Sequence, residues 1–441
     1  MKIVQITPGA GGMYCGNCFR DNALVSALRQ MGHDAVMVPL YLPLTLDEQD
    51  QSAGVPIFFG GINVYLEQKS SLFNHAPVWM RGLLSSRRAL QWAAGRAART
   101  RAADLGEITL SMLRGEEGRQ ALELEELISW LKDQSKPDVI CLSNALLIGL
   151  VRRLKAALDA PVLCALQGED TFLDALPAAH RDVCWRTLAE RAAEADGFIA
   201  PGSYYGDLMR RRLGLRPDRV RVIFNGINLT GYAGHEPSPN PKPAPRALGY
   251  FARMCPEKGL DSLVEAFIAL RRRNRVTDIK LRIGGSCGPS DQPFVAAQRQ
   301  KLSDAGLLAD VEFHPNIDRS AKIEFLRGLT VFSVPALYGE AFGLYVIEAL
   351  AAAVPVVQPR SAAFPELIQA TGGGVLYSPG DTNALADALE DLFLHPDNAR
   401  LLGEAGRRAV FDRFSARAMA ESTFDYFQSV RSEKSSAAHV V

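Results

Sequence analysis

The chain alternates short runs of apolar and β-branched residues with longer segments of helical periodicity, and it does so in two series. Strands that alternate with helices are typical of a parallel sheet whose crossover helices cover both faces. The pattern therefore predicts an α/β protein with two doubly wound domains. The first series comprises residues 3–6, 35–40, 138–142, 162–166, 197–200 and 220–224, and the second comprises residues 247–251, 281–283, 311–313, 331–334, 354–357 and 375–377.

Residues 234–246, GHEPSPNPKPAPR, separate the two series. Five prolines in these thirteen residues exclude a regular helix or central strand, because proline lacks a backbone N–H and has a fixed φ. We therefore predict a stiff linker between an N-terminal domain of residues 1–233 and a C-terminal domain of residues 247–411. Residues 412–431 are expected to form a helix that returns to the N-terminal domain, and residues 432–441 a flexible polar tail.

Charge and composition limit the classes of function. Lysine plus arginine equals aspartate plus glutamate at 49 each, so no net field attracts nucleic acid. The first residues lack the basic and apolar regions of a signal peptide, and no apolar run is long enough to span a bilayer. The seven cysteines are odd in number, and Cys141 and Cys164 lie in apolar runs, as buried free thiols do. These features predict a cytoplasmic protein.

The segment PALYGEAFGLYVIEALAAAVPVV, residues 335–357, contains the strongest indication of a functional site. It predicts a strand end, a glycine-flanked loop that carries Glu340, and a helix that begins near Gly343 and contains Glu348. The first amides of such a helix favour a phosphate. The two carboxylates, roughly 10 Å apart along a helix, suit the vicinal hydroxyls of a sugar and a ribose. A first-turn charge and a solvated helix residue remain the alternative interpretation.

Arg253 and Lys258 follow the first strand of the second series, in the loop before the next helix. Both cations would lie at the carboxyl end of that strand, where they could hold a diphosphate leaving group. Positive charge there lowers the barrier, because its interaction strengthens as negative charge develops on the leaving group. As isolated residues they would more often be surface charges, but we expect them at the same sheet edge as the two glutamates.

Four glycines follow the first strand, in the segment TPGAGGMYCGN, residues 7–17. Glycine lets the backbone approach a phosphate closely. Tyr14 breaks the dinucleotide fingerprint at its third glycine, so we exclude a nicotinamide site. Cys15 and Cys18 form a single Cys-x-x-Cys pair without the second pair that a zinc site needs. A redox dithiol and two packed small residues both remain open for this pair.

In these motifs the chain resembles family 4 of the nucleotide-sugar glycosyltransferases, a retaining group with the GT-B fold. The likeness covers most of the chain. It implies two Rossmann-like domains that face each other across a cleft, and transfer of a hexose from a nucleotide diphosphate sugar, with a UDP-sugar favoured, to a saccharide or lipid-linked acceptor. The motifs, in the order of the family, are NGIN at 225–228, Arg253 to Lys258, Glu340-x7-Glu348, PELI at 365–368 and GGGVLYSPGD at 372–381.

The resemblance also implies roles for individual residues. Glu340 would contact the donor hexose and Glu348 the ribose, while Arg253 and Lys258 would bind the diphosphate. Members of the family generally need no metal, so no metal or other cofactor is expected. Retention would proceed by front-face attack, with the departing phosphate accepting the proton of the acceptor. The remaining donor-binding residues would be Phe342, Gly343 and Leu344 through their amides, with Gly12, Gly16 and Gln167 from the N-terminal domain.

Four residues in three motifs depart from the family pattern. Gln167 stands where the family often has histidine, Ala362-Ala363 where a Gly-Gly pair commonly precedes Pro-Glu, and Ala353 where glycine is usual. The added methyl groups would narrow the nucleotide pocket or change the base that fits. A catalytically degenerate nucleotide-sugar-binding module, and an epimerase or phosphorylase on the same fold, therefore remain as alternatives.

Residues 81–102 carry six arginines and no acidic residue, together with three leucines and Trp92. Such a segment would lie on an anionic membrane surface. A solvated helix packed on the N-terminal domain is the alternative. The sequence thus predicts peripheral contact with the inner face of the membrane through residues 81–102.

Overall fold

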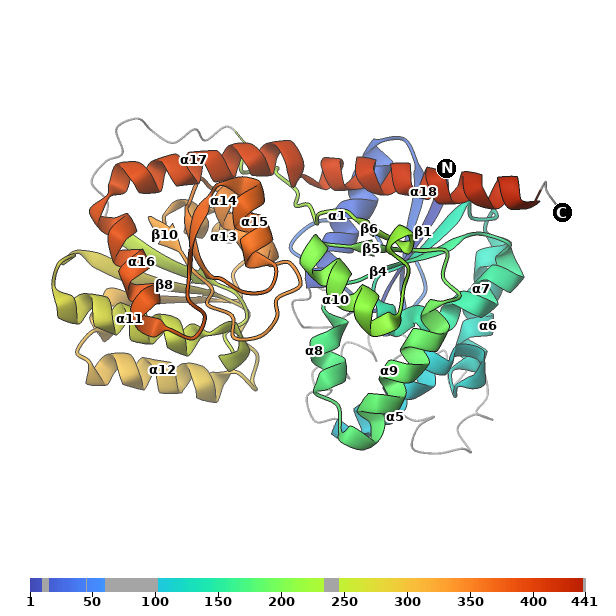
Figure 1. Cartoon of the computed structure of the whole chain (residues 1–441), viewed down its shortest axis with the longest axis horizontal. Helices are drawn as coiled ribbons and strands as arrows, with labels where there is room; N and C mark the ends of the chain where they lie inside the picture. The colour runs from blue at the N-terminus through green and yellow to red at the C-terminus, as the bar shows by residue number, and fades with distance from the viewer. Residues whose placement is uncertain (10–15, 45, 60–101, 234–245, 439–441) are drawn as a thin grey trace. The chain divides into compact units, whose positions relative to one another are not determined.

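The computed structural model describes residues 1–9, 16–44, 46–59, 102–233 and 246–438. The chain divides into two compact units (Figure 1): unit 1 is Met1–Phe224 with Met419–Val441, and unit 2 is Asn225–Ala418. The division falls between Phe224 and Asn225, ahead of the boundary expected at residue 233. Gly12, Cys15, nearly all of the arginine-rich segment and all of the expected linker except Arg246 lie outside the described residues.

Unit 1 contains a parallel sheet with the strand order β2-β1-β3-β4-β5-β6. The strands coincide with the apolar runs of the first series, and β3, β4 and β5 are buried along their whole length, as expected where helices cover both faces. The order reverses beside β1, which creates the switch point where such sheets bind ligands. The strands are β1 Lys2–Thr7, β2 Asp34–Pro39, β3 Val139–Leu142, β4 Val162–Ala165, β5 Gly197–Ala200 and β6 Val220–Val222.

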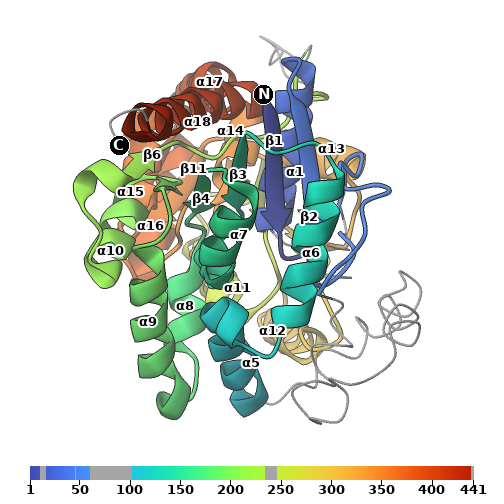
Figure 2. The same cartoon turned by 90° about the vertical axis from the view of Figure 1, so that its right-hand side faces the viewer.

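Helices from both ends of the chain pack on this sheet. α6 and α7 lie side by side (Figure 2). Cys141 and Cys164 are buried free thiols, as predicted. The helices are α1 Gly16–Gln30, α5 Ala102–Arg114, α6 Ala121–Asp133, α7 Val151–Leu158, α8 Glu169–Asp174, α9 Ala178–Ala192 and α10 Ser203–Leu213, with the 3-10 segments η3 Gly115–Glu117 and η4 Ala145–Leu150.

The last helix, α18 Ala416–Ala438, completes unit 1. Phe427 is fully buried, and Phe424 stacks on His33 with 4.0 Å between ring centroids. The helix continues past residue 432, so the flexible tail expected from that point is wrong as far as Ala438. Lys434 contacts Asp159 at 3.1 Å in this last part, an ion pair that composition alone does not reveal.

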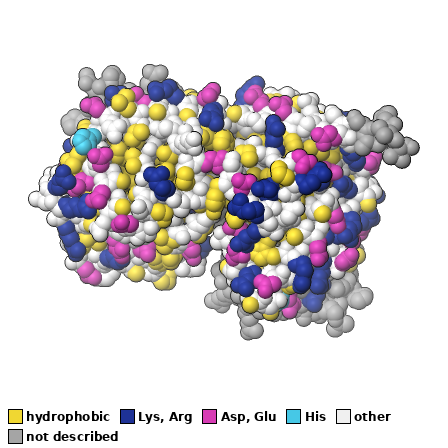
Figure 3. Space-filling model, in the orientation of Figure 1, with side chains coloured by type: hydrophobic (Ala, Val, Ile, Leu, Met, Phe, Trp, Pro, Cys, Tyr) yellow, Lys and Arg dark blue, Asp and Glu magenta, His cyan; other side chains and the backbone are white. Residues whose placement is uncertain are grey.

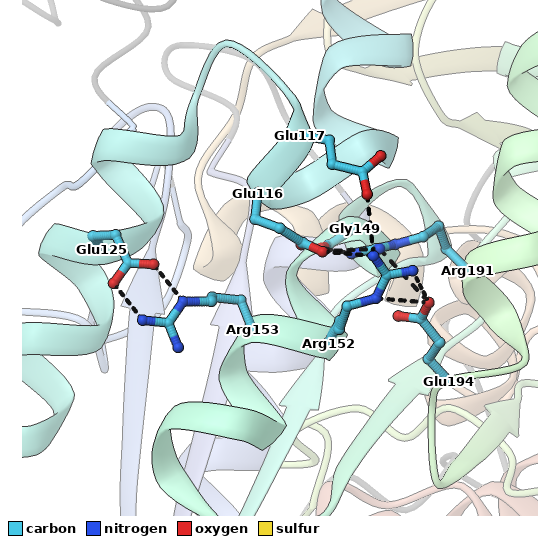
Figure 4. Close-up of polar contacts among 8 residues, drawn as sticks. All are labelled: Glu116, Glu117, Glu125, Gly149, Arg152, Arg153, Arg191 and Glu194. Carbon is cyan, nitrogen blue, oxygen red and sulfur yellow. Dashed lines mark hydrogen bonds and ion pairs between the residues drawn. The ribbon is translucent and has the colours of Figure 1, made fainter.

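A network of ion pairs joins η3, α7 and α9 in unit 1 (Figure 4). The buried Arg191 donates to Glu116 at 2.8 Å and to the carbonyl of Gly149 at 2.7 Å. Arg152 donates to Glu194 at 2.6 Å and to Glu116 at 2.8 Å. Burial acts to raise the pKa of Glu116, but the hydrogen bond from Arg191 and the two guanidinium charges outweigh it and lower that pKa. The network ties η3 to α7 and to α9.

Unit 2 contains a second parallel sheet with the strand order β12-β11-β10-β7-β8-β9. β7 therefore lies between β8 and β10, and the loops that leave β7 and β10 emerge next to each other. The strands again coincide with the predicted apolar runs. They are β7 Arg246–Phe251, β8 Ile279–Gly285, β9 Val311–Pro315, β10 Val331–Phe332, β11 Val356–Pro359 and β12 Gly374–Tyr377.

Helices cover both faces of this sheet. In Figure 1, α11 and α12 lie below the strands and α13 and α14 above them. Basic and acidic side chains are interspersed on the face of the molecule shown in Figure 3. The helices are α11 Leu260–Arg273, α12 Gln292–Asp304, α13 Arg319–Arg327, α14 Leu344–Ala351, α15 Phe364–Thr371, α16 Thr382–Leu394 and α17 Pro396–Arg413, with the 3-10 segment η6 Pro256–Lys258.

Two alanines of unit 2 adopt left-handed backbone conformations. Ala353 has φ 62° and Ala362 has φ 54°. Ala353 ends α14 in a Schellman motif, since its N–H donates to Leu350 and the N–H of Val354 donates to Ala349. Glycine is favoured at this position because a Cβ is strained there. Of the three alanines that depart from the family pattern, Ala353 and Ala362 are therefore strained, and they lie on either side of β11.

Candidate functional site

Two loops meet at the carboxyl edge of the sheet in unit 2. The N–H of Leu337, after β10, donates to the carbonyl of Glu257 in η6 at 3.0 Å. Gly259 has φ 69°, and a Cβ there would collide with the carbonyl oxygen of Pro335. Gly343 has φ 91° and precedes α14, where a Cβ would lie 3.3 Å from the ring of Phe364. Glycine at these turns lets the β7 and β10 loops lie against each other.

Lys258 and Glu340 form the centre of this edge. The Nζ of Lys258 lies 2.6 Å from Oε2 of Glu340, and the two side chains are only 19% and 13% exposed. The hydroxyls of Tyr338 and Tyr345 donate to the same carboxylate oxygen at 3.2 and 2.8 Å. The Lys258 ammonium also lies 4.8 Å from the ring centroid of Tyr338 and 5.2 Å from that of Tyr345. Three donors therefore hold Glu340 in one orientation.

The electrostatics of this cluster favour a charged lysine. Burial acts to lower the pKa of Lys258, but the Glu340 carboxylate and Tyr338 outweigh it and raise that pKa above its usual value. Burial, and then the Glu340 charge, raise the pKa of Tyr338 and of Tyr345. At neutral pH the site thus presents an ammonium and two neutral phenols, all of them hydrogen-bond donors.

Arg253 occupies the same edge with a different partner. Its guanidinium forms a bidentate pair with Asp291, with Nη2–Oδ1 at 2.8 Å and Nε–Oδ2 at 3.2 Å. Asp291 is 7% exposed, whereas the arginine side chain is 52% exposed. The hydrogen bond to Asp291 raises the pKa of Arg253. A buried carboxylate therefore fixes a guanidinium that is still open to an anion.

Glu348 lies inside α14, eight residues after Glu340. Its Oε1 accepts a hydrogen bond from Nζ of Lys322 on α13 at 2.8 Å. The side chains of Lys322 and Glu348 are 13% and 19% exposed. Each of the two glutamates singled out in the sequence is therefore paired with a lysine that is more than four-fifths buried.

Unit 1 holds a buried carboxylate at the corresponding end of its sheet. Glu169, at the start of α8, accepts hydrogen bonds from the N–H of Ala145 at 2.7 Å, the N–H of Gln167 at 2.9 Å and the hydroxyl of Tyr205 at 2.8 Å. Burial raises the pKa of Glu169 above its usual value. Tyr205 also donates toward Asp170 at 3.0 Å. This cluster joins the ends of β3 and β4 and their following helices.

The structure brings some of the predicted site residues together and leaves others apart. Lys258 and Glu340 are in direct contact, and Phe342, Gly343 and Leu344 connect Glu340 to α14. Arg253 contacts Asp291 instead of the glutamates. Gly16 begins α1 and Gln167 precedes α8, both in unit 1.

Sequence reasoning missed the side chains that position the predicted residues: Tyr338, Tyr345, Asp291 and Lys322. The two tyrosines lie within the motif of residues 335–357 and could have been found there, since each is within five positions of Glu340. Asp291 and Lys322 carry no local signal, because they follow β8 and β9 and reach the site only through the strand order.

Neither a metal cluster nor a membrane span is found in the part of the chain that the structure describes. No group of three or more His, Cys, Asp or Glu side chains is placed there to hold a metal ion. Among the described helices, none combines the length and apolar character that crossing a membrane requires.

Two family models match the chain. The model described as "Glycosyl transferases group 1" matches residues 235–409, and the model described as "Glycosyltransferase Family 4" matches residues 107–230. The first match contains all of the unit 2 site, and the second contains Gln167. Together the two matches cover more than half of the chain.

Curated relatives give the same picture at moderate identity. The chain is 32% identical over 267 residues to alpha-maltose-1-phosphate synthase of Mycolicibacterium smegmatis, which covers 56% of this chain and 65% of the relative. It is 28% identical over 250 residues to D-inositol 3-phosphate glycosyltransferase of Saccharomonospora viridis, covering 54% and 56%. The chain thus spans between about half and just under two thirds of the length of these relatives.

Solved structures share the fold over nearly the whole chain. Sucrose-phosphate synthase from Thermosynechococcus elongatus has a TM-score of 0.69 at 18% identity, covering 98% of this chain and all of that one. Anabaena HepE in complex with UDP has a TM-score of 0.67 at 16% identity, covering 97% of this chain and all of that one. At these identities the likeness concerns the fold alone.

Proposed function

The chain belongs to the group 1 glycosyl transferases of family 4, and its fold is the two-domain α/β GT-B fold expected from the sequence; we propose that it is a retaining hexosyltransferase. It would transfer a hexose from a nucleoside diphosphate sugar, with a UDP-sugar favoured, to a saccharide or lipid-linked acceptor. The observation that carries this proposal is the contact between Lys258 and Glu340 in the loop that precedes α14.

The cations of the site suit a diphosphate leaving group. Lys258 is charged and more than four-fifths buried, and Arg253 is fixed by Asp291 while about half of its side chain remains exposed. Negative charge grows on the β-phosphate as the glycosidic bond to the donor breaks, so both cations bind more tightly as the reaction proceeds. The amides that begin α14 add donors and the positive end of a helix dipole.

The glutamates suit hydroxyl groups. The lysine and the two tyrosines all contact Oε2 of Glu340, and we assign Oε1 to the hydroxyls of the donor hexose. Glu348, inside α14, would accept from the ribose. A carboxylate can accept several hydrogen bonds, so both assignments leave their existing contacts in place.

Retention would proceed from the front face of the sugar. Glu340 is already held by three donors, which makes its Oε2 a poor nucleophile. In the proposed mechanism the departing phosphate accepts the proton of the attacking acceptor hydroxyl, and no bond forms between the sugar and the enzyme. The two cations would supply the charge stabilisation that a divalent ion supplies elsewhere.

Dialysis against EDTA should therefore change the rate of sugar transfer by less than about twofold. A large loss of rate on dialysis that added Mg²⁺ restores would contradict this assignment.

The names of similar proteins support a nucleotide-sugar donor without fixing the base. HepE is described with UDP and with UDP-glucose, whereas a mannosyltransferase of Mycolicibacterium smegmatis, 31% identical over 172 residues, is described as GDP-mannose-dependent. We favour UDP for this chain. The acceptor is assigned only to the class of saccharides and lipid-linked saccharides.

A thermal-shift panel tests the donor assignment. UDP, GDP and ADP, with their sugar conjugates, should be added to the wild type, to Glu348→Ala and to the control Glu404→Ala, whose carboxylate pairs with Arg400 on α17. A ligand that binds only the native state raises its melting temperature. We expect a shift with one nucleotide that persists in the control and is lost in Glu348→Ala.

The same panel separates the alternatives. A shift without sugar transfer to any acceptor would indicate a degenerate binding module. Consumption of the donor without an acceptor would indicate an epimerase. No shift with any nucleotide would overturn the assignment of unit 2 as a nucleotide-sugar site.

A further inference from the structure

The contact between Lys322 and Glu348 is a second lysine–glutamate pair beside the proposed donor site. Lys322 lies on α13 and Glu348 on α14, two helices that contact each other on one face of the sheet. The Nζ–Oε1 distance is 2.8 Å, and both side chains are more than four-fifths buried. Removing two charges from water is costly, so a pair of this kind contributes little to stability by itself. Because the pair adds little stability and lies beside the proposed donor site, we look for its role in ligand binding.

α13 is fixed at its start, which limits the positions that Lys322 can reach. Asp318 caps the helix by accepting from the N–H of Ala321 at 2.9 Å. Arg319 donates to the carbonyl of Asn228 at 2.8 Å, and Ile323 is buried. A lysine on an anchored helix loses less freedom on binding than a lysine on a loop, because much of its conformational entropy is already lost.

We propose that Lys322 is a positioning residue for Glu348 and a second ligand of the ribose, a role that rests on the proposed function. Lys322 occupies Oε1 and leaves Oε2 for a ribose hydroxyl. An ammonium has three donors, so Lys322 can donate to Glu348 and to a ribose hydroxyl at the same time. A hydroxyl that donates to the carboxylate can accept from the ammonium, so the pair recognises a hydroxyl in both of its hydrogen-bonding roles. A carboxylate alone can only accept the hydrogen bond that the hydroxyl donates.

The pair should therefore discriminate between ribose and deoxyribose. Loss of Lys322 frees Glu348 to rotate and removes one donor to the sugar, and both effects concern the hydroxyls alone. The diphosphate is assigned to Arg253, Lys258 and the start of α14, so binding of pyrophosphate should not depend on Lys322.

Isothermal titration of four variants tests this role. The wild type, Lys322→Met, Lys322→Arg and the control Lys301→Met are titrated with UDP, GDP and ADP, with the 2′-deoxy and 3′-deoxy forms of the one that binds, and with pyrophosphate. Lys301 forms a 2.7 Å pair with Glu265 on the other face of the same sheet, a pair of similar length but more exposed to solvent. The methionine keeps most of the apolar length of the lysine.

We expect Lys322→Met to weaken the ribonucleotide roughly tenfold, the size of one hydrogen bond to a charged group, and to weaken one deoxy form by less than about twofold. Lys322→Arg should restore at least half of the discrimination, and Lys301→Met should match the wild type. Equal weakening of ribo and deoxy forms, or weakened pyrophosphate, would show that Lys322 acts only on the fold and would overturn the proposal. If the wild type binds no nucleotide, the proposed function itself fails, and the role of Lys322 fails with it.

Discussion

Glu340 in unit 2 and Glu169 in unit 1 both follow the carboxyl end of a parallel strand, but their surroundings differ. Glu340 contacts an ammonium and two phenols and keeps 13% of its side chain exposed. Glu169 is 4% exposed and is held by two backbone amides and the hydroxyl of Tyr205. The same residue type thus serves two purposes. Glu340 contacts a cation and two phenols at the edge of a sheet, whereas Glu169 accepts only from neutral donors and links packed elements of unit 1.

The largest expected effect is on turnover through Glu340. Glu340→Gln should lower the rate of sugar transfer about 10²–10³-fold, because a neutral amide binds the donor hydroxyls more weakly and leaves Lys258 unbalanced. Initial rates with the best donor measure this effect. Glu312→Gln, on β9, is the control and should keep full activity; the Glu312 carboxylate pairs with Arg282 on β8. A glycosyl adduct trapped on Glu340 would instead refute front-face attack.

Glu169 should affect stability more than activity. Glu169→Ala removes the carboxylate that accepts from the N–H groups of Ala145 and Gln167 and leaves the Tyr205 hydroxyl with Asp170 alone, which should lower the free energy of unfolding by about 2–4 kcal/mol. Denaturant titration measures it. Glu125→Ala, at an exposed pair with Arg153 (Figure 4), should change stability by less than about 0.5 kcal/mol. If Glu169→Ala is as stable as the wild type but inactive, the structural role assigned to Glu169 is wrong, and so is its contrast with Glu340.

The two carboxylates should also differ in their pH dependence. Burial raises the folded-state pKa of Glu169, so its contribution to stability is fully present below the unfolded pKa of about 4.3 and is lost as pH rises through the folded pKa. The loss is about 1.4 kcal/mol for each pH unit between the two pKa values. Unfolding of the wild type and Glu169→Gln from pH 4 to 8 measures the difference, which should be absent from the glutamine variant.

Lys258 should show no such dependence in this range. Its folded-state pKa is raised, so its contribution is complete below the unfolded pKa near 10.4 and is lost only in alkali. A stability difference between the wild type and Lys258→Met that changes from pH 5 to 8 would contradict the assignment of Lys258 as a permanent cation.

The smallest expected effect concerns the strained alanine that ends α14. Ala353→Gly should raise the free energy of unfolding by up to about 1 kcal/mol, because glycine adopts φ 62° without strain. Ala405→Gly, inside α17, should lower it by a similar amount. Equal and opposite shifts in the denaturation midpoint would show that the backbone at Ala353 is strained and that the backbone at Ala405 is not. A loss of stability in Ala353→Gly would remove the argument for strain.

The apolar runs predicted all the strands described in the two sheets, because buried parallel strands leave a strong local pattern. Periodicity does not give the strand order, and the order decides which loops meet. Lys258 and Glu340 were expected at one edge, and they touch because β10 lies beside β7. Lys322 could not be predicted, since a lysine on an amphipathic helix looks like any solvated charge until the facing helix is known.

The return of α18 to unit 1 has a consequence for the order of events during synthesis. Unit 2 is continuous in sequence, whereas the core of unit 1 needs Phe427 from the far end of the chain. A ribosome therefore releases every residue of unit 2 before the final helix of unit 1. Unit 1 is therefore the first unit to begin synthesis and the last to be complete. Until α18 is made, the strands of unit 1 lack the helix whose Phe424 stacks on His33.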